Sequence, residues 1–536
     1  MSFEVREKDL LGRIGRLETK SGQMETPTLL PVVNPRIQLI KPRDLLEVFG
    51  CKALITNAYI IQKQYGSEAV KKGVHQLLGY DGVVMTDSGA YQILVYGDVE
   101  TGNEEIIHFQ EQINSDIATI LDTPTGWKVS KNYANGTVEE TLRRAERLWK
   151  IKTRNDIIWV GPIQGGQHLD LIVRSAKKMS KLPFQIHALG SPTPVMEQYF
   201  FDLLVDMIMA AKMNLPMDRP LHLFGAGHPF MLSLAVALGC DLFDSAAYAL
   251  FARDGRYMTE SGTKRLNELE YFPCSCPVCA KNNPIGLLES PTEERQKLLA
   301  EHNLFVSLGE LRLIKQAILE GRLWEHLEMK AHAHPALLQS LKQLKKYEGY
   351  IEENSPITKS RGLFYFDSVG LSRPEVVRHR KRLAARYLPP EKADTLFLLP
   401  QTSMKPFHKA REWQDILSKI HENLGESSSK VHVCVYSAPF GVVPLELDEV
   451  YPLSQHEVAV PLDNETVDYV AGQVAVYIET MSYEKVVLLE DRKIWKRIVT
   501  NACRRACKKK NIRFSDLQRQ GTKDAFVTGL WEALRM

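Results

Sequence analysis

The stretch Gly82-Val-Val-Met-Thr-Asp87 decides the fold, because a short apolar run ends directly in a carboxylate. Seven further runs in the first 250 residues share this plan, with an apolar body and a polar or glycine-rich end. The eight runs are residues 28–33, 53–57, 82–87, 117–122, 157–164, 184–190, 221–225 and 240–244. The intervening stretches are long enough for helices. Strands that alternate with helices favour parallel pairing, and eight such units predict an α/β fold, the closed (β/α)8 TIM barrel.

Polar side chains gather at the ends of these runs. Asp87, Asp122 and Asp244 end three of them, and Gln164 and Gly190 end two more. A single aspartate at a strand end is more often the N-cap of the next helix. Active sites of such barrels lie at the C-terminal ends of the strands, so three aspartates at matching ends predict an enzyme.

The bulk composition is that of an ordinary globular protein. The chain has 536 residues, of which 44% are hydrophobic and 25% charged. That length is too great for one core, so several domains are expected. No run of about 18 apolar residues occurs, and the start of the chain lacks a signal-peptide pattern, so we expect a cytoplasmic protein.

We expect three regions along the chain. Residues 1–345 form the barrel with a metal-binding insertion, residues 346–480 form a smaller α/β linker domain, and residues 481–536 form a basic C-terminal segment. Between Arg492 and Arg513 there are ten lysines and arginines and no acid. Such a cluster suits RNA phosphates, or it is a solvated helix face with Trp495 on its buried side; the sequence alone leaves both open.

Three clustered cysteines, Cys274, Cys276 and Cys279, predict a metal site at about residues 274–302. His302 is our candidate for the fourth ligand, although His326 and other nearby histidines compete with it. A full Cys3His set leaves no open position, so we expect one structural zinc ion per chain. The other five cysteines are not expected to form a site, and the sequence assigns no role to Cys503 or Cys507.

The carboxylates suggest a reaction class. Two carboxyl groups at a barrel mouth can serve as nucleophile and as general acid/base at an anomeric carbon, and Asp87 and Asp244 are the candidates. Asp122 and Gln164 offer acceptors and donors to a planar polar ligand. Tyr91, four residues beyond Asp87, could stack on an aromatic base.

Several ordered motifs resemble one family. The strings MTDSGAYQ (residues 85–92), GPIQGG (161–166), ALGS (188–191) and FDSAAYALFARDG (243–255), followed by the cysteine–histidine set, are similar to those of tRNA-guanine transglycosylases. The match covers essentially the first 345 residues. The resemblance implies that Asp244 attacks C1′ of the target ribose to form a covalent ribosyl-enzyme and that Asp87 is the general acid/base. It further implies that the base is bound by Ser88, Tyr91, Asp122, Gln164 and Gly190, with Tyr91 stacking on it.

The resemblance is greatest to the archaeal branch, which inserts 7-cyano-7-deazaguanine (preQ0) at position 15 in the D-loop of tRNA during archaeosine biosynthesis. The bacterial branch has a glutamate after the glycine matched by Gly190, whereas this chain has Ser191 and then Pro192. A neutral nitrile suits that change, because an unpaired buried carboxylate is costly. Residues 373–382, 404–407 and 440–457 also resemble the archaeal linker domains.

The resemblance also concerns partners. Archaeal members usually end in a PUA domain that grips the tRNA, and this sequence ends at Met536 soon after its basic segment. We therefore expect a PUA domain to be absent here, with a separate PUA-containing subunit completing the grip, or else a homodimer and the basic segment sufficing. Family members dimerise through the zinc-bearing region, so a homodimer is expected.

Two rival functions remain. An archaeosine synthase-like paralogue would use a lysine in the region of Lys405, but Gln401 replaces the cysteine expected there, and such paralogues tend to lose the barrel aspartates. Lys405 is thus expected to be an ordinary solvated lysine. A non-catalytic tRNA-binding subunit would lack Asp244 or Asp87, both of which this chain keeps.

Overall fold

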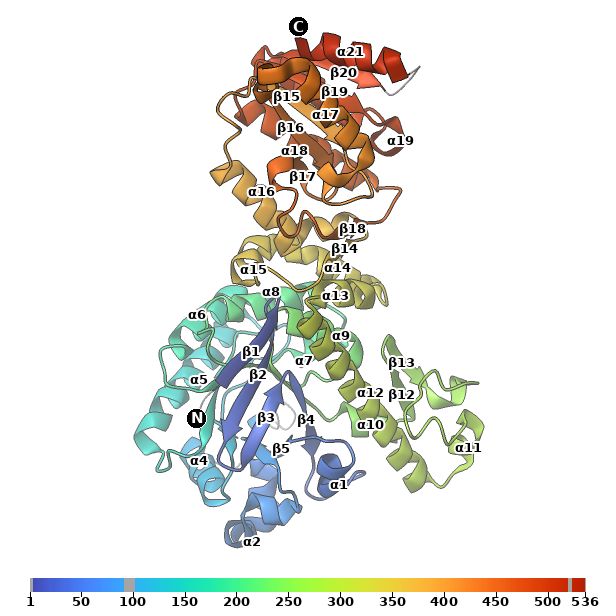
Figure 1. The fold of residues 1–536 in the computed structure, drawn as a ribbon. Helices are drawn as coiled ribbons and strands as arrows, with labels where there is room; N and C mark the ends of the chain where they lie inside the picture. Colours follow the sequence, from blue (N-terminus) through green and yellow to red (C-terminus); the bar gives the residue numbers. More distant parts are fainter. Residues whose placement is uncertain (1–2, 91–101, 519–522, 536) are drawn as a thin grey trace. The chain divides into compact units, whose positions relative to one another are not determined.

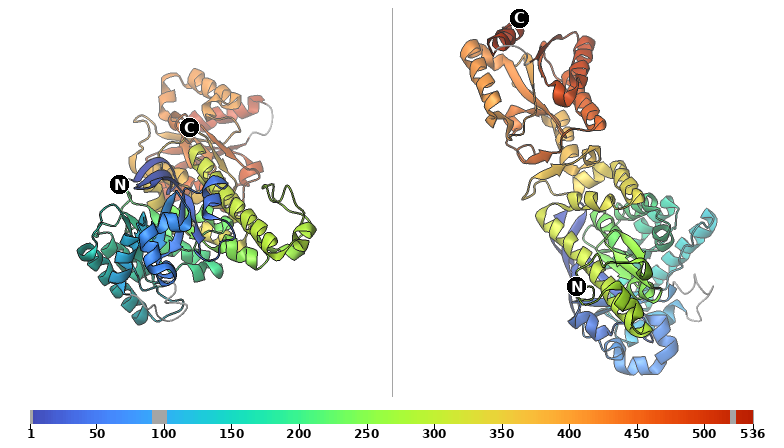
Figure 2. Two further views of the ribbon diagram at one scale, coloured as in Figure 1. Left: turned by 90° about the horizontal axis from the view of Figure 1, so that it is seen from below. Right: turned by 90° about the vertical axis from the view of Figure 1, so that its right-hand side faces the viewer.

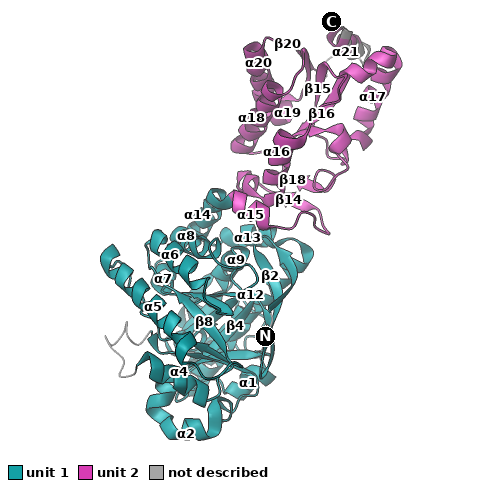
Figure 3. Cartoon of the chain, turned by 90° about the vertical axis from the view of Figure 1, so that its left-hand side faces the viewer, with its two compact units in different colours: residues 1–347 teal, residues 348–536 magenta. Residues whose placement is uncertain are grey.

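The computed structural model describes residues 3–90, 102–518 and 523–535. The chain forms two compact units, residues 1–347 and 348–536 (Figure 3). Tyr91, the expected stacking residue, lies outside the described residues.

Unit 1 contains a closed barrel of eight parallel strands (Figure 1). In spatial order the neighbours are β10-β11-β4-β5-β6-β7-β8-β9. The strands are β4 (Thr28–Val33), β5 (Ala53–Asn57), β6 (Val83–Asp87), β7 (Ile117–Thr119), β8 (Ile158–Ile163), β9 (Ile186–Leu189), β10 (Leu221–Leu223) and β11 (Leu242–Ser245). Each lies within or overlaps one of the eight predicted runs, so the predicted fold class is confirmed.

Helices connect the strands and surround the barrel (Figure 2). They are α1 (Pro42–Glu47), α2 (Ala58–Leu78), α4 (Asn103–Gln112), α5 (Lys131–Ile151), α6 (Leu169–Met179), α7 (Thr193–Glu197), α8 (Phe201–Lys212), α9 (Pro229–Ala237) and α10 (Ala247–Arg253). Each βα connection returns the chain to the same end, so every strand points its C-terminal end to one mouth.

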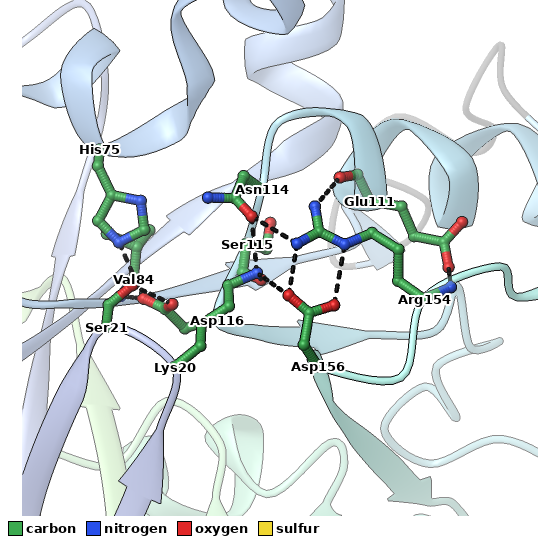
Figure 4. A network of polar contacts seen from close by, with 10 residues as sticks. All are labelled: Lys20, Ser21, His75, Val84, Glu111, Asn114, Ser115, Asp116, Arg154 and Asp156. Atoms are coloured by element: carbon green, nitrogen blue, oxygen red, sulfur yellow. Dashed lines mark hydrogen bonds and ion pairs between the residues drawn. The ribbon is translucent and has the colours of Figure 1, made fainter.

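A small antiparallel sheet closes the other end of the barrel. It consists of β1 (Phe3–Asp9), β2 (Gly12–Thr19) and β3 (Gly22–Thr26). Leu17 and Met24 of this sheet share a core cluster with residues of the barrel strands. At the β2–β3 turn, Ser21 Oγ donates to Asp116 Oδ1 at 2.6 Å and Lys20 Nζ donates to the Ser115 carbonyl at 2.7 Å (Figure 4). This hairpin therefore covers the N-terminal ends of the strands.

The end of unit 1 carries the cysteine cluster. A hairpin of β12 (Arg256–Thr259) and β13 (Gly262–Arg265) follows α10, and the helices α11 (Pro284–Glu289), α12 (Thr292–Glu320), α13 (Leu323–Ala331) and α14 (Pro335–Gln343) come next. Helix α12 packs on both α10 and α9. Its long axis thus joins the cysteine region to the barrel (Figure 1).

Unit 2 is an α/β domain with one five-stranded sheet in the order β17-β16-β15-β19-β20. Its strands are β15 (Thr395–Pro400), β16 (Val431–Ser437), β17 (Gly441–Pro444), β19 (Lys485–Glu490) and β20 (Arg513–Gln518), of which β17 alone pairs antiparallel. A separate parallel pair joins β14 (Leu363–Tyr365) to β18 (His456–Val458). The helices are α15 (Glu348–Asn354), α16 (Pro374–Arg386), α17 (Arg411–Leu424), α18 (Asn464–Thr480), α19 (Arg492–Trp495), α20 (Ile498–Lys510) and α21 (Lys523–Arg535).

The expected division at residue 480 falls inside this sheet. Strand β19 pairs with β15 and β20 pairs with β19, so residues 485–518 complete the same domain. None of the described helices is both long and apolar enough to span a lipid bilayer.

Candidate active site and metal centre

Three aspartates lie at the C-terminal mouth of the barrel. Asp87 is the last residue of β6, Asp244 lies in β11, and Asp122 follows β7 by three residues. Asp87 interacts electrostatically with both Asp122 and Asp244, although β4 and β5 separate β6 from β11 around the barrel. The fold therefore brings three carboxyl groups from distant parts of the sequence to one site.

Asp87 is placed to hold a proton near neutral pH. Its Oδ2 accepts hydrogen bonds from Asn57 Nδ2 at 3.1 Å and from the Gly89 N–H at 3.3 Å. Burial, and then the charges of Asp122 and Asp244, raise the pKa of the Asp87 carboxyl to about 7. A group with such a pKa can both donate and accept a proton under physiological conditions.

Asp122 and Gln164 form the second part of the site. Gln164 Nε2 donates to Asp122 Oδ2 at 2.5 Å, while Gln164 Oε1 accepts from the Thr125 N–H at 2.9 Å and from Ser191 Oγ at 3.1 Å. Burial raises the pKa of Asp122 to about 6, against the opposing effect of the Gln164 hydrogen bond. The amide of Gln164 is thus fixed in orientation by three partners.

Gly190 is required beside that amide. A Cβ at Gly190 would lie 2.2 Å from Gln164 Nε2, so any side chain there would displace Gln164. Glycine at this position therefore lets Gln164 keep its place beside the backbone.

Ser88 presents an unpartnered hydroxyl at the same mouth. It follows Asp87 directly and is fully buried, and its Oγ has no hydrogen-bond partner within the described residues. Buried hydroxyls are normally paired, and this one has no partner within the described part of the chain.

Asp244 is held by two donors. His222 Nε2 lies 2.9 Å from Asp244 Oδ1, and the Gly225 N–H donates to the same oxygen at 3.0 Å. Asp244 has 9% of its surface exposed, whereas His222 is fully buried. The carboxylate is therefore oriented and still accessible from the mouth.

Sequence reasoning missed Asn57, His222, the Gly225 N–H and the contact of Ser191 with Gln164. Asn57 could have been found, because it is the polar end of the run 53–57. His222 lies between two leucines of β10, and its sequence context does not distinguish it from a core histidine.

The cysteine cluster forms a possible metal centre. The ligand atoms of Cys274, Cys276, Cys279 and His302 all lie within 4.8 Å of one another. His302 Nδ1 lies 3.4 Å from Cys276 Sγ and 3.3 Å from Cys279 Sγ. Four donors at this separation could hold one metal ion.

The surroundings of His302 fit a metal ligand. Its Nε2 is 2.9 Å from the Met258 carbonyl, which fixes the ring so that Nδ1 faces the thiols. Such a second hydrogen bond to a carbonyl is typical of metal-bound histidine. The ring of Tyr257 stacks on His302 with centroids 3.7 Å apart, and its hydroxyl lies 3.3 Å from Cys279 Sγ. The competing His326 instead lies 2.9 Å from Glu310 Oε1.

The basic segment of unit 2 is partly a core helix. Trp495 and Val499 are buried, and Cys503 and Cys507 lie in the same core cluster. Four of its cations are paired with acids: Arg492 and Arg497 with Glu490, Arg504 with Asp516, and Lys509 with Glu479. Five others form no ion pair within the described part of the chain: Lys493, Lys496, Arg505, Lys508 and Lys510.

Lys405 differs from the solvated lysine that we expected. It is partly buried, and this burial lowers the pKa of its ammonium group, while the charge of Glu457 acts in the opposite direction. Gln401 is engaged elsewhere, because its Oε1 accepts from the Ala438 N–H at 2.8 Å.

Comparison with known proteins supports the reading of the barrel. A family model described as queuine tRNA-ribosyltransferase matches residues 9–336, and a domain family of unknown function matches residues 376–534. A protein of Pyrobaculum aerophilum named tRNA-guanine(15) transglycosylase is 47% identical over 463 residues, which are 85% of this chain and 90% of that protein.

Two further relatives carry the same name. The protein of Methanocaldococcus jannaschii is 44% identical over 477 residues, 87% of this chain and 70% of its own length. That of Saccharolobus solfataricus is 42% identical over 501 residues, 92% of this chain and 97% of its own length.

Proposed function

This chain belongs to the queuine tRNA-ribosyltransferase family of tRNA-guanine transglycosylases, and from that premise we propose that it exchanges guanine 15 in the D-loop of tRNA for preQ0. The observation that carries the proposal is the pair of carboxyl groups at one mouth, Asp244 held by two donors and Asp87 with a pKa of about 7. A nucleophile and a proton carrier are what a double displacement at C1′ needs.

In the first half of the reaction, Asp244 attacks C1′ of the ribose and the bond from C1′ to N9 of guanine breaks. Asp87 gives its proton to the departing guanine. In the second half, the incoming base loses its proton to Asp87 and attacks C1′, and the bond to Asp244 breaks. Two inversions restore the original configuration. The target nucleotide must leave its stack to reach the mouth.

The base lies against Asp122, Gln164, Ser88 and Gly190 in this proposal. The fixed amide of Gln164 and the unpaired Ser88 Oγ supply donors and acceptors for the edge of a purine-like ring. No acid follows Gly190; Ser191 is there and donates to Gln164. A neutral nitrile therefore meets no unpaired carboxylate at this position. Tyr91 as the stacking residue stays a prediction from the sequence.

We propose zinc as the ion of the cysteine cluster, since three thiolates and one imidazole are the donors of closed structural zinc sites. Cys276→Ser should reduce bound zinc from one ion per chain, as measured by metal analysis of the purified protein, and should lower its melting temperature. Cys51→Ser is the matched control, because Cys51 is buried at a distance in sequence from the cluster and should leave the zinc content unchanged.

The unpaired cations of α19 and α20 are the proposed contact of unit 2 with tRNA phosphates. Replacing Lys508 and Lys510 together by glutamine should weaken tRNA binding and reduce its salt dependence, whereas the paired Lys509 is the control. A homodimer and a separate PUA-containing subunit stay predictions. Light scattering at micromolar protein tests the first, and addition of such a subunit to the assay tests the second.

The proposed function is tested by release of labelled guanine from tRNA that carries it at position 15. Wild type should release the label when preQ0 is present, and Asp244→Ala should release none although it still binds tRNA. Asp254→Asn is the control, because Asp254 is an exposed partner of Arg256. No release by wild type even with a PUA-containing subunit would contradict the proposal and favour a non-catalytic tRNA-binding subunit.

A further inference from the structure

The two hydrogen bonds to Asp244 reach the same oxygen. His222 Nε2 and the Gly225 N–H both contact Oδ1, at 2.9 and 3.0 Å. Within the described residues no hydrogen bond reaches Oδ2. The two oxygens of Asp244 therefore differ: Oδ1 accepts two hydrogen bonds, and Oδ2 accepts none within the described residues.

Both donors come from β10 and the turn that follows it. His222 lies in β10, which pairs in parallel with β11, the strand of Asp244, through Leu223 and Phe243. Gly225 follows β10 with a φ of +69°, and a Cβ there would lie 2.6 Å from Thr193 Oγ1. Glycine is therefore required for the turn that aims its N–H at Asp244.

The contact fixes which ring nitrogen of His222 faces Asp244. A carboxylate oxygen only accepts, so Nε2 must carry a proton. Nδ1 is buried and has no hydrogen-bond partner within the described residues, so Nε2 is the nitrogen that serves Asp244.

We infer that His222 is a positioning residue which, together with the Gly225 N–H, holds Oδ1 of Asp244 so that Oδ2 attacks C1′. The inference rests on the proposed transglycosylation. Fully buried behind Asp244, His222 acts through the carboxylate and not on the substrate. Fixing the nucleophile in its reactive orientation lowers the entropy lost on reaching the transition state.

A second buried histidine of the barrel, His187, serves as a control for a purely structural role of His222. His187 lies in the neighbouring strand β9 and is buried, and burial lowers the pKa of its imidazole to about 4. It forms no hydrogen bond with a carboxylate in the part of the chain that the structure describes. His187→Phe therefore measures the cost of replacing a barrel histidine without touching the nucleophile.

The test compares His222→Phe, His222→Gln and His187→Phe in single-turnover reactions, with denaturing gels that detect tRNA bound covalently to protein. His222→Phe should slow adduct formation by roughly 10- to 100-fold while the Kd for tRNA changes less than about twofold. His222→Gln keeps a side-chain N–H in reach of Oδ1 and should recover most of that loss. His187→Phe should leave the adduct rate unchanged even where it lowers the melting temperature.

Two results would overturn the inference. The first is a folded His222→Phe variant that forms the adduct at the wild-type rate. The second is a His222→Gln variant whose adduct rate is no higher than that of His222→Phe, with both rates equal to that of His187→Phe. If wild type forms no adduct with tRNA, the proposed function fails as well. A wild-type adduct together with an unaffected His222→Phe removes the inference alone.

Discussion

The two ends of the barrel carry the same chemical group, the carboxylate, in opposite surroundings. At the N-terminal end, the oxygens of the buried acids Asp116, Asp241 and Glu111 are engaged by cations, N–H groups and hydroxyls. At the C-terminal mouth, Asp87, Asp122 and Asp244 lie close together. Their hydrogen-bond partners among the described residues are side-chain amides, backbone N–H groups and the His222 imidazole, with no lysine or arginine. The partners of an acid, more than its burial, therefore separate a structural carboxylate from a reactive one.

Asp241 and Glu111 exemplify the N-terminal end. Arg13 binds Asp241 through two nitrogens at 2.7 and 2.8 Å, and the Leu221 N–H donates to it as well. Glu111 accepts from the Thr153 N–H, the Arg154 N–H and the Thr153 hydroxyl, and these bonds keep its pKa below the usual range although burial opposes them. Such groups hold strand ends together and have no free oxygen for chemistry.

The largest expected effect is on chemistry at the mouth. Asp87→Asn removes the proton carrier and should reduce guanine exchange by about 10²- to 10⁴-fold. Binding of tRNA should persist, and the folded structure should be retained, because asparagine can still accept from Gly89. Exchange assays together with filter binding check both. Activity of Asp87→Asn near that of wild type would contradict the role of Asp87 as proton carrier, and with it the contrast between the two ends of the barrel.

At the opposite end, the same type of change should affect stability and not chemistry. Asp241→Asn leaves the guanidinium of Arg13, which is 3% exposed, without its anion. Breaking a buried pair in this way costs roughly 3–5 kcal/mol of unfolding free energy. Urea unfolding measures the loss, while the exchange rate per folded molecule should match wild type. A specific loss of catalysis in a stable variant would contradict the assignment.

The contribution of the acids to folding stability should change with pH in opposite directions at the two ends of the barrel. The folded pKa of Asp87, about 7, lies above its unfolded value of about 3.8, so the folded state loses stability as pH rises from about 4 to 7. Asp87→Asn should therefore stabilise the protein by about 1–3 kcal/mol at pH 8 and not at pH 3.5. Glu111, with its depressed pKa, contributes stability above its unfolded pKa that is lost as pH falls through its folded value.

The same titration should appear in the kinetics. Formation of the adduct needs the protonated form of Asp87, so its single-turnover rate should fall about tenfold per pH unit above pH 7. An adduct rate that is flat from pH 6 to 9 would show that another group supplies the proton.

The smallest effect on stability is expected at Lys20, whose polar contacts lie at the N-terminal end of the barrel. Lys20 donates to Asn114 Oδ1 and the Ser115 carbonyl and lies 3.5 Å from the half-exposed Asp156. Lys20→Ala should cost about 1 kcal/mol, since partly exposed ion pairs contribute little. Urea unfolding at low and high salt measures it. A loss as large as that of Asp241→Asn would mean that exposure does not decide the strength of these contacts.

The barrel could be predicted because each of its strands can be recognised from a short stretch of sequence. Each strand appears as a short apolar run with a polar end, and alternation with helices implies parallel pairing. The sheet of β1 to β3 was not predicted, since its strands pair with one another and cover the barrel in ways that no local pattern encodes. Strand β20 was also missed, because Arg513–Gln518 has the composition of a polar turn.

The site could be predicted only in part, for a similar reason. Aspartates at strand ends are visible in the sequence, and so are clustered cysteines. The donors to Asp244 are not, because His222 and Gly225 acquire their role from the pairing of β10 with β11. The charges of the basic segment likewise gave no measure of which cations are already neutralised by Glu490 and Asp516.

The central claim, that Asp244 is the nucleophile, is tested most directly by locating the covalent bond. Wild-type protein is incubated with tRNA in the absence of an incoming base, digested, and the modified peptide is identified by mass spectrometry. The account predicts a ribosyl-RNA fragment on the side chain of Asp244 and none in Asp244→Asn. A fragment on Asp87 or Asp122, or guanine release by Asp244→Asn at the wild-type rate, would contradict it.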